Sequence, residues 1–249
     1  MSKSMQKRLT AQLNPWFYEV EIAGVMTVPG IGTDWTAQKL IQRQRYRHVM
    51  LVDRVASKFT FEGKRILDMG CNCGYWGSEY IKLGAIDYFG VDGRQKYIEQ
   101  GRLYWGANVF AKHDYSWDFM AMDVNCEDAL SVLDKDRWDF TLCAGLLYHI
   151  KDYRKILDKI SKVTTGAILI DTRVEQEERE VEEPGDLCFN GIPGALTKTV
   201  PSITKLLGYM NKLGWKTEVI EPLNRKIPPG LSCKDDYSVG NRITVLCRR

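Results

Sequence analysis

The chain has 249 residues, of which 44% are hydrophobic and 27% are charged, and its formal net charge is +3. This balance is typical of a globular protein with a sizeable core, and the length suits one α/β domain with an appendage. The charge neither requires nor excludes a nucleic-acid partner, which usually shows as a concentrated basic face.

Two further observations exclude whole classes of protein. No apolar run is long enough to span a membrane, and the polar first residues lack the apolar centre of a signal peptide, so we expect a cytoplasmic protein without membrane partners. The seven cysteines are odd in number and several lie in apparent core strands, which predicts reduced thiols rather than disulfides. Their spacing matches no zinc site, so we expect no metal.

The first part of the chain, residues 1–58, is predicted to form an N-terminal helical and β cap that includes a lid helix. Residues 2–13 suit a short helix, and residues 16–22 suit a strand rich in aromatic side chains. Asp34 is the predicted N-cap of the long lid helix, which covers about residues 35–57.

On the lid helix, four basic side chains fall on one stripe: Lys39, Arg43, Arg47 and Arg54. The stripe is either a solvated face or an electropositive wall over a substrate mouth, which would favour phosphate, carboxylate or RNA. His48 lies toward the apolar side of the same helix, and we expect it to be a semi-buried, hydrogen-bonded histidine.

Residues 65–77 predict a short buried strand, a glycine-rich turn and the start of a helix. Glycine in such a turn lets backbone N–H groups face a ligand and tolerates positive φ. A dinucleotide site would place glycine where Asn72 stands, and the Asp68 carboxylate would repel a pyrophosphate. Asn tolerates the left-handed region, so the turn is kept, and Asp68 suits a ligand with an amino group and a sulfonium.

A second apolar strand, residues 88–92, ends in Asp92 at the distance from the turn where an acid can bind a ribose diol. Residues 67–74 together with Val91 and Asp92 resemble the S-adenosylmethionine (SAM) site of class I methyltransferases. The resemblance implies SAM as cofactor, with the loop at its methionine part and the later acid at its ribose; the alternative is a glycine-rich turn without a ligand. The cofactor-binding residues implied by this part of the chain are Asp68, Gly70, Cys71, Asn72, Gly74 and Asp92.

From residue 59 onward, strand and helix patterns alternate. The predicted strands are 65–68, 88–92, 117–123, 138–145, 166–172, 216–220 and 242–247, and the predicted helices between them are 94–110, 126–134, 152–163 and 202–213. This alternation predicts an α/β fold with a mostly parallel, doubly wound sheet. The resemblance implies that it is the Rossmann-like class I methyltransferase sheet of about seven strands. The domain is expected to cover residues 59–249, with an insertion near residues 175–200.

Ligands in such a sheet lie beyond the carboxyl ends of the strands, where Asp123, Gly145 and Asp171 fall. In the resembled family, the residue at the position of Asp123 hydrogen-bonds the adenine amino group, and a neighbouring backbone N–H, here that of Val124, meets a ring nitrogen. Gly145 opens the stretch that closes beneath the SAM methyl group. For Asp123, a surface turn residue is the alternative.

Residues 145–149, Gly-Leu-Leu-Tyr-His, are similar to the form of this stretch in the wobble-uridine tRNA methyltransferase/carboxymethyltransferase family. Residues 16–17, 28–30 and 200–202 resemble that family too. Its carboxymethylating members use a SAM derivative that has an added carboxylate. They bind this carboxylate through a Lys, an Arg and the Tyr that corresponds to Tyr148. The Lys and the Arg have no assigned counterpart in this sequence, so we expect plain SAM and plain methyl transfer.

Methyl transfer from a sulfonium needs mainly the alignment of an acceptor with the methyl carbon. A general base helps when the acceptor is an alcohol or a protonated amine, and His149 and Asp171 are the candidates. Tyr148 completes the predicted catalytic set as a residue of the acceptor wall. For His149, a structural role in the loop is the alternative.

Six glutamates between residues 175 and 183 form an acidic run. Such a run is usually a solvated face, but its place directly after the fifth strand puts it at the rim of the site. Repulsion from these carboxylates argues mildly against a long RNA that crosses the rim.

Four hypotheses for function follow. The first is SAM-dependent O- or N-methylation of a small-molecule or sugar acceptor. The second is wobble-uridine modification of tRNA, which the family resemblance and the basic helix support. A third, a nicotinamide-dependent dehydrogenase, is disfavoured by Asp68 and Asn72. The fourth is a SAM-binding partner subunit without catalysis of its own.

Overall fold

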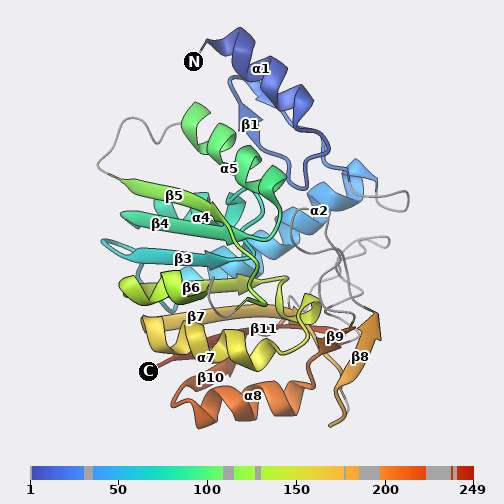
Figure 1. Ribbon diagram of the computed structural model, residues 1–249, viewed down its shortest axis with the longest axis vertical. Helices are drawn as coiled ribbons and strands as arrows, with labels where there is room; N and C mark the ends of the chain where they lie inside the picture. Colours follow the sequence, from blue (N-terminus) through green and yellow to red (C-terminus); the bar gives the residue numbers. More distant parts are fainter. Residues whose placement is uncertain are drawn as a thin grey trace.

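The computed structural model describes residues 2–30, 36–108, 115–126, 130–176, 178–184, 197–222, 237 and 240–249. Within these residues, one seven-stranded sheet forms the centre, helices cover both of its faces, and the N-terminal segment packs at one end (Figure 1). No helix in this part of the chain is long and apolar enough to cross a membrane.

The central sheet has the predicted doubly wound topology. Its strands are β3 (Arg65–Met69), β4 (Asp87–Asp92), β5 (Ser116–Ala121), β6 (Trp138–Ala144), β7 (Thr164–Arg173), β10 (Lys216–Val219) and β11 (Arg242–Arg248). Their order across the sheet is β10-β11-β7-β6-β3-β4-β5, and only β11 pairs in antiparallel fashion, with β7 and β10. The chain winds outward from β3 to β5 and then returns to β6, so β3 and β6 flank the point where a ligand crevice is expected.

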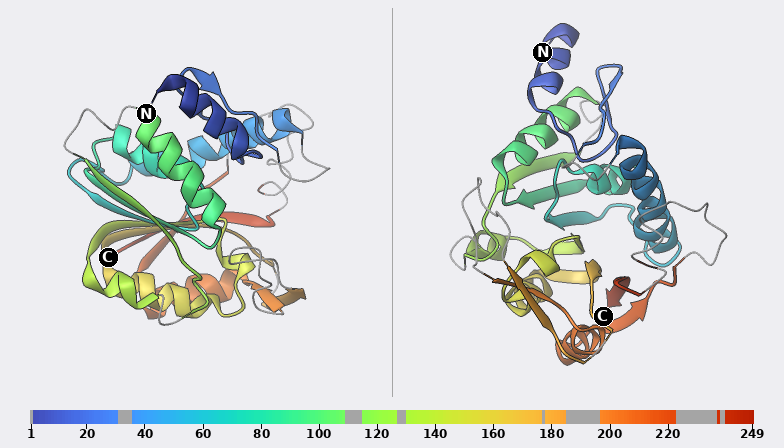
Figure 2. Two further views of the ribbon diagram at one scale, coloured as in Figure 1. Left: turned by 45° about the horizontal axis from the view of Figure 1, so that its top comes forward. Right: turned by 90° about the vertical axis from the view of Figure 1, so that its right-hand side faces the viewer.

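Helices from two parts of the chain cover the two faces of the sheet. The helical segments are α4 (Tyr75–Lys82), α5 (Gln95–Ala107), the 3₁₀ turns η3 (Ser131–Lys135) and η4 (Leu147–His149), α7 (Tyr153–Val163) and α8 (Ile203–Lys212). In the left view of Figure 2, the blue and green helices lie on one face and the yellow and orange helices α7 and α8 on the other. Each face has its own cluster of buried apolar side chains, which is why β6 and β7 are apolar on both sides.

The lid helix is continuous but changes its winding. It consists of α2 (Ala37–His48), a π-helical turn η1 (Val49–Asp53) and α3 (Arg54–Ala56), which matches the predicted length. The Thr36 hydroxyl caps it by accepting a hydrogen bond from the backbone N–H of Lys39 at 3.3 Å. Asp34, the predicted cap, lies outside the described residues.

The N-terminal segment contains α1 (Lys3–Gln12) and the short pair β1 (Glu21–Ile22) and β2 (Val25–Met26). The strand predicted over residues 16–22 is therefore a strand only at its end. Its side chains alternate in burial, because Trp16, Tyr18, Val20 and Ile22 are all buried. Its partner β2 has only two residues, and the remainder bends at residues 17–18 after an isolated bridge between Trp16 and Pro29. The four buried side chains belong to the same apolar cluster as α4 and α5.

Two segments add detail to the prediction. Within the range 126–134 where a helix is expected, Leu130 is helical and donates its backbone N–H to the Cys126 carbonyl at 3.1 Å, the 3₁₀ turn η3 follows, and residues 127–129 lie outside the described residues. The expected insertion contains the antiparallel pair β8 (Val181–Pro184) and β9 (Thr197–Val200), at the lower right of Figure 1. Within its acidic run, Glu180 pairs with Arg154 at 2.6 Å and Glu183 with Arg173 at 3.0 Å. These ion pairs reduce the repulsion that the run would exert on an RNA.

Candidate active site

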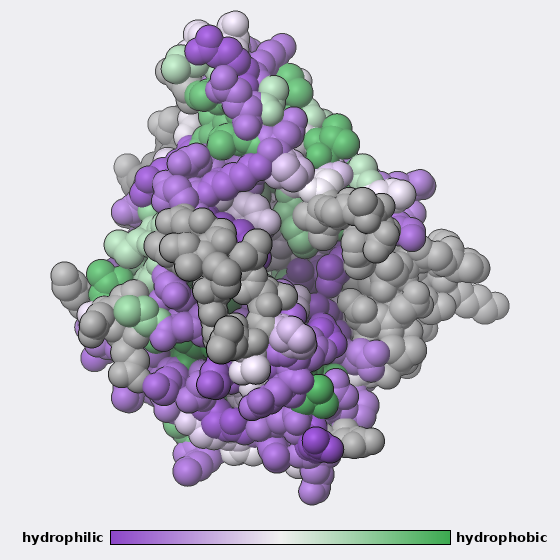
Figure 3. Space-filling view, turned by 45° about the vertical axis from the view of Figure 1, so that its right-hand side comes forward, coloured by the Kyte–Doolittle hydropathy of each residue, from purple (hydrophilic) through white to green (hydrophobic). Residues whose placement is uncertain are grey.

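A cavity of about 170 Å³ lies at the carboxyl ends of β3, β4 and β6, where the winding direction changes. Eight of the predicted site residues line it: Gly70, Asn72, Asp92, Asp123, Val124, Gly145, Tyr148 and His149. Figure 3 shows the molecule with this side turned forward, and hydrophilic side chains dominate the described part of the view. Among the described residues, no group of acidic, histidine and cysteine side chains could hold a metal ion.

The glycine loop between β3 and α4 forms one wall of the cavity. Gly70, Asn72 and Gly74 have φ values of 77°, 53° and 72°, so Asn72 adopts the left-handed conformation that the sequence predicted. A Cβ atom at Gly70 would lie 3.2 Å from the Cβ of Leu146 on the facing wall. Glycine at this position therefore keeps the crevice open.

The backbone N–H groups of this loop are used within the protein. Those of Gly70 and Cys71 both donate to the Val91 carbonyl, at 2.8 and 2.9 Å, and that of Asn72 donates to the Asp92 carboxylate at 2.9 Å. The next two N–H groups also bond inside the loop. The expectation that these groups face a ligand is therefore wrong. A pyrophosphate site needs such donors, so the loop disfavours a dinucleotide.

Asp92 ends β4 with its carboxylate at the cavity. Its two oxygens accept hydrogen bonds from the backbone N–H groups of Asn72 and Arg94, both at 2.9 Å. Burial raises the pKa of Asp92, and these two hydrogen bonds oppose the rise. They also fix the carboxylate in one orientation, as a site for a ribose diol requires.

The next part of the wall follows β5. The Asp123 carboxylate accepts hydrogen bonds from the backbone and side chain of Asn125, at 2.9 and 3.0 Å. Val124 and Tyr97 line the cavity beside it, and the Arg94 guanidinium lies 5.3 Å from the centre of the Tyr97 ring. The combination of an acid with an aliphatic and an aromatic wall suits a flat heterocycle that carries an amino group.

Three residues predicted to bind the cofactor do not line the cavity. Asp68 is buried beneath the loop and accepts a hydrogen bond from the Tyr88 hydroxyl at 3.0 Å; burial raises its pKa to about 7. The Cys71 side chain is buried as well. At Gly74, a Cβ atom would lie 2.7 Å from the Phe119 ring. These residues support the loop from behind, which corrects the expectation of direct contact.

Gly145, Tyr148 and His149 follow β6 and form the opposite wall. Gly145 has a φ of 80°, and a Cβ atom there would lie 3.8 Å from the Tyr148 hydroxyl and 3.9 Å from Nη2 of Arg47. The rings of Tyr148 and His149 lie 4.2 Å apart. The open position at Gly145 thus leaves a space that a phenol and a guanidinium both border.

Asp171 occupies a different place from the one predicted. It is fully buried and does not line the cavity. One carboxylate oxygen accepts hydrogen bonds from Arg47 and Arg242, each at 2.7 Å, and the other accepts them from Tyr237 and Thr244. Burial alone would raise the pKa of Asp171, but the two guanidinium charges and the two hydroxyls outweigh it and lower the pKa to about 2. An acid this weakly basic and this enclosed is not a general base, which corrects the expectation.

Helix α2 supplies two arginines of the predicted basic stripe to the cavity, Arg43 and Arg47. The other two members of the stripe point elsewhere: Lys39 is exposed, and Arg54 donates to the Glu221 carbonyl. The electropositive wall is therefore narrower than the stripe.

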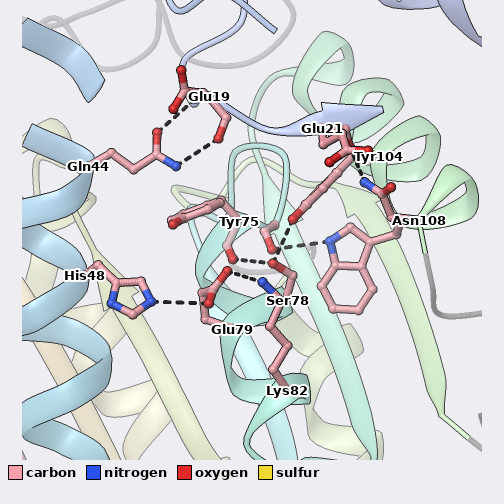
Figure 4. A network of polar contacts seen from close by, with 12 residues as sticks. Glu19, Glu21, Gln44, His48, Tyr75, Ser78, Glu79, Lys82, Tyr104 and Asn108 are labelled. Atoms are coloured by element: carbon pink, nitrogen blue, oxygen red, sulfur yellow. Dashed lines mark hydrogen bonds and ion pairs between the residues drawn. The ribbon is translucent and has the colours of Figure 1, made fainter. Parts of the chain in front are cut away.

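A polar network holds α2 against the rest of the protein (Figure 4). The Gln44 side chain bonds both backbone groups of Glu19, at 2.8 and 3.0 Å. His48 contacts Glu79 of α4 at 3.2 Å, and the hydrogen bond to Glu79 is the main cause that raises the pKa of His48. Because α2 is fixed at Gln44 and His48, Arg47 between them and Arg43 next to Gln44 are held at the cavity.

The sequence did not single out several cavity residues as site residues. Phe17 and Tyr18 come from the N-terminal segment, and Tyr97 comes from the first turns of α5. Trp76 donates its indole N–H to the Tyr18 hydroxyl at 2.9 Å, which anchors that aromatic segment on α4. The only available signal was the aromatic run near residue 17, because contacts between segments so distant in sequence leave no local pattern.

Comparison with known proteins decides the family. The sequence profile described as "Methyltransferase domain" matches residues 41–218. The chain belongs to this methyltransferase family. It is therefore an enzyme of a family whose methyl donor is SAM, and the dehydrogenase hypothesis falls away.

Two curated relatives of this methyltransferase represent different acceptor classes. The tRNA U34 carboxymethyltransferase of Campylobacter jejuni is 28% identical over 155 residues, which are 61% of this chain and 50% of the relative. The ubiquinone biosynthesis O-methyltransferase of Coxiella burnetii is 29% identical over 105 residues, or 41% of this chain and 40% of the relative. The chain thus spans about half the length of the curated relatives it matches.

Solved structures share the fold of this methyltransferase. The N-terminal domain of EvdMO1 with SAH bound has a TM-score of 0.67 at 18% identity, covering 100% of this chain and 97% of that one. Magnesium protoporphyrin IX methyltransferase from Synechocystis with bound SAM has a TM-score of 0.57 at 12% identity, covering 88% and 86%. These likenesses agree with the class I methyltransferase fold predicted for the sheet.

The cavity of this methyltransferase fits SAM on three independent observations. The crevice at Gly70 would be filled by a Cβ atom, the loop N–H groups are not arranged for a phosphate, and the Asp92 carboxylate is buried and oriented. The residues present thus agree with the methyl donor of the family.

Proposed function

We propose that this methyltransferase transfers the methyl group of SAM to a hydroxyl or amino group of a small molecule, with a sugar as the favoured acceptor. The observation that carries the proposal is the composition of the cavity. One end has the oriented acids Asp92 and Asp123, and the other end is bordered by Tyr148, His149 and the N-terminal segment. A cavity enclosed by walls from so many segments suits a compact acceptor better than it suits a polynucleotide.

Within this proposal, Asp92 holds the ribose, and Asp123 with the backbone N–H of Val124 holds the adenine. Bound SAM supplies a methyl group on a sulfonium, which needs no further activation. The protein's part is to align the acceptor in the space beside Gly145 and to exclude water with Phe17 and Tyr18. As the acceptor's bond to the methyl carbon would form and the carbon–sulfur bond would break, the acceptor proton would pass to His149, and Tyr148 would border the acceptor as a wall residue.

The comparisons support a compact acceptor. The N-terminal domain of EvdMO1 in the presence of SAH and D-fucose has a TM-score of 0.66 at 19% identity and covers 97% of that chain. That likeness includes the N-terminal segment, because it extends over 100% of this chain. The Coxiella relative is an O-methyltransferase of ubiquinone biosynthesis.

A second candidate is modification of wobble uridine in tRNA, with transfer of a carboxymethyl group. The observation in its favour is that Nη2 of Arg242 lies 3.3 Å from the Tyr148 hydroxyl. The sequence resemblance called for an arginine beside this tyrosine, and Arg242 on β11 is a suitable candidate. The relatives in Campylobacter carry out this modification.

The test measures binding and turnover separately. Calorimetry with SAM should show binding that Asp92→Asn weakens at least about tenfold, because each lost charged hydrogen bond is worth about 1.5–3 kcal/mol. The matched control is Asp118→Asn, which changes an exposed acid on the neighbouring strand and should leave affinity unchanged. If the folded wild-type protein does not bind SAM, the cofactor site is wrong.

Turnover is then followed with SAM labelled in its methyl group. Label is expected in the small-molecule fraction of a cell extract, including its sugars, rather than in bulk tRNA. Label in tRNA alone would favour the second candidate. Binding of SAM without label in either fraction would favour the non-catalytic subunit.

A further inference from the structure

The acceptor end of the cavity is bordered by positive charge. Arg43 and Arg47 line the cavity from α2, and Arg242 reaches Tyr148 from β11. The Arg242 guanidinium lies 5.3 Å from the centre of the Tyr148 ring, and that of Arg173 lies 5.7 Å from it. Four guanidiniums from three elements therefore lie near one phenol and the space beside it.

Two of these arginines are held in place by the protein itself. Arg47 is 4% exposed, pairs with Asp171 at 2.7 Å, and has its guanidinium 5.5 Å from the centre of the Trp76 ring. Arg242 is 2% exposed and pairs with the same carboxylate oxygen at 2.7 Å. Because both side chains are already ordered, they lose little conformational entropy when they bind an anion.

The charges of these arginines also change the pKa of Tyr148. Burial would raise the pKa of the Tyr148 hydroxyl, but the charges of Arg242, Arg43 and Arg47 outweigh burial and lower it. A negative charge is therefore favoured where the Tyr148 oxygen lies. The open position at Gly145 has this oxygen at 3.8 Å and Nη2 of Arg47 at 3.9 Å, so the favourable region extends into the cavity.

The opposite end of the cavity has the opposite charge, because Asp92 and Asp123 lie there. We propose that the acceptor carries a carboxylate, bound by Arg43 and Arg47 beside Tyr148, so that the acceptor is an acid such as a sugar acid or a hydroxy acid. The inference rests on the proposed methyl transfer. A carboxylate fits this place because its two oxygens can accept from a guanidinium fork and from a phenol at once.

The test uses SAH-bound protein labelled with ¹⁵N in arginine, titrated with acetate and, separately, with acetamide of nearly the same shape. Acetate should shift the side-chain signals of Arg43 and Arg47 in the millimolar range, and acetamide should not. In Arg43→Gln the acetate affinity should fall at least about tenfold, and Arg43→Lys should restore part of it. The matched control is Arg45→Gln, which removes an exposed guanidinium from the same helix and should bind acetate as the wild type does.

Equal acetate affinity in the wild type and Arg43→Gln would overturn the proposal. A second outcome that overturns it concerns the cofactor's own carboxylate. If Arg43→Gln weakens SAH but not 5′-methylthioadenosine, which lacks the amino acid part, then Arg43 binds the cofactor and not the acceptor. Failure of the folded wild-type protein to bind SAH would instead contradict the proposed function, so the two failures are distinguishable.

Discussion

The two ends of the cavity are built in different ways. The cofactor end consists of short segments that directly follow β3, β4 and β5, and its key hydrogen bonds join residues close in sequence or on adjacent strands. The acceptor end depends on pairs far apart in the sequence, such as Arg47 with Asp171, 124 residues apart, and Arg242 with Tyr148, 94 residues apart. The first end is made by backbone conformation and the second by tertiary contacts between charged side chains.

This difference tells which substitutions should matter for which property. Where the backbone carries the site, substitutions that preserve the conformation should be tolerated. Where a buried charge network carries it, removal of one member leaves the others in an unfavourable medium. Stability should therefore be more sensitive at the acceptor end, and substitutions at three positions test this contrast.

The largest effect is expected for Asp171→Ala. The substitution removes the carboxylate that Arg47 and Arg242 share, and breaking a buried ion pair in this way typically costs about 3–5 kcal/mol. Urea unfolding should show a fall of that size in the free energy of unfolding. The control is Asp118→Ala at an exposed ion pair, for which the change should stay within about 0.5 kcal/mol.

The pH dependence of stability, compared between the wild type and Asp171→Ala, tests whether the carboxylate charge is responsible. Because the folded pKa of Asp171 is lowered to about 2, its ionised form contributes stability above the unfolded pKa, and this contribution disappears as the pH falls toward 2. The difference in stability between wild type and Asp171→Ala should therefore shrink between about pH 4 and pH 2. A constant difference over that interval would mean that the carboxylate charge is not what stabilises the network.

The sequence was sufficient for the sheet because each parallel strand is a short apolar run with a clear end. β3, β6 and β7 are buried on both faces, so their patterns were unambiguous. The segment at residues 16–22 was expected to be a strand because of its aromatic side chains, yet such a run does not reveal whether a partner strand is long enough to form a ladder. The π turn within the lid helix has no sequence pattern at all.

For the site, the sequence placed residues at strand ends but not the directions of their side chains. Asp92, Asp123 and Tyr148 reach the cavity, whereas Asp68 points beneath the loop and Asp171 into a buried network. All but Tyr148 are acids that end or follow strands, so sequence position alone could not separate them. What separates them is the partner that each side chain meets, and those partners come from other strands and helices.

An intermediate effect is expected for Asp68→Asn, which tests whether the cofactor end depends on the loop backbone. Burial raises the folded pKa of Asp68 to about 7, above its unfolded value, so the ionised acid destabilises the protein as the pH rises through that range. The amide keeps an acceptor for the Tyr88 hydroxyl. Asp68→Asn should therefore gain about 1–2 kcal/mol of stability at pH 8 and less at pH 5. Its affinity for SAM should match the wild type; a large loss would mean that Asp68 itself contacts the cofactor.

The smallest effect is expected at Asn72, where the contrast with Asp171 is clearest. With a φ of 53°, Asn72 is in a conformation that glycine adopts freely, so Asn72→Gly should change the free energy of unfolding by only a few tenths of a kcal/mol. Both variants lose the side-chain oxygen that accepts from the N–H of Cys73 at 2.8 Å, but alanine also keeps a Cβ in the left-handed region, so Asn72→Ala should cost about 1–2 kcal/mol. SAM affinity, measured by calorimetry, should follow the same order. If glycine proves as harmful as alanine, then the Asn72 side chain, and not the backbone conformation, is what this end of the cavity requires.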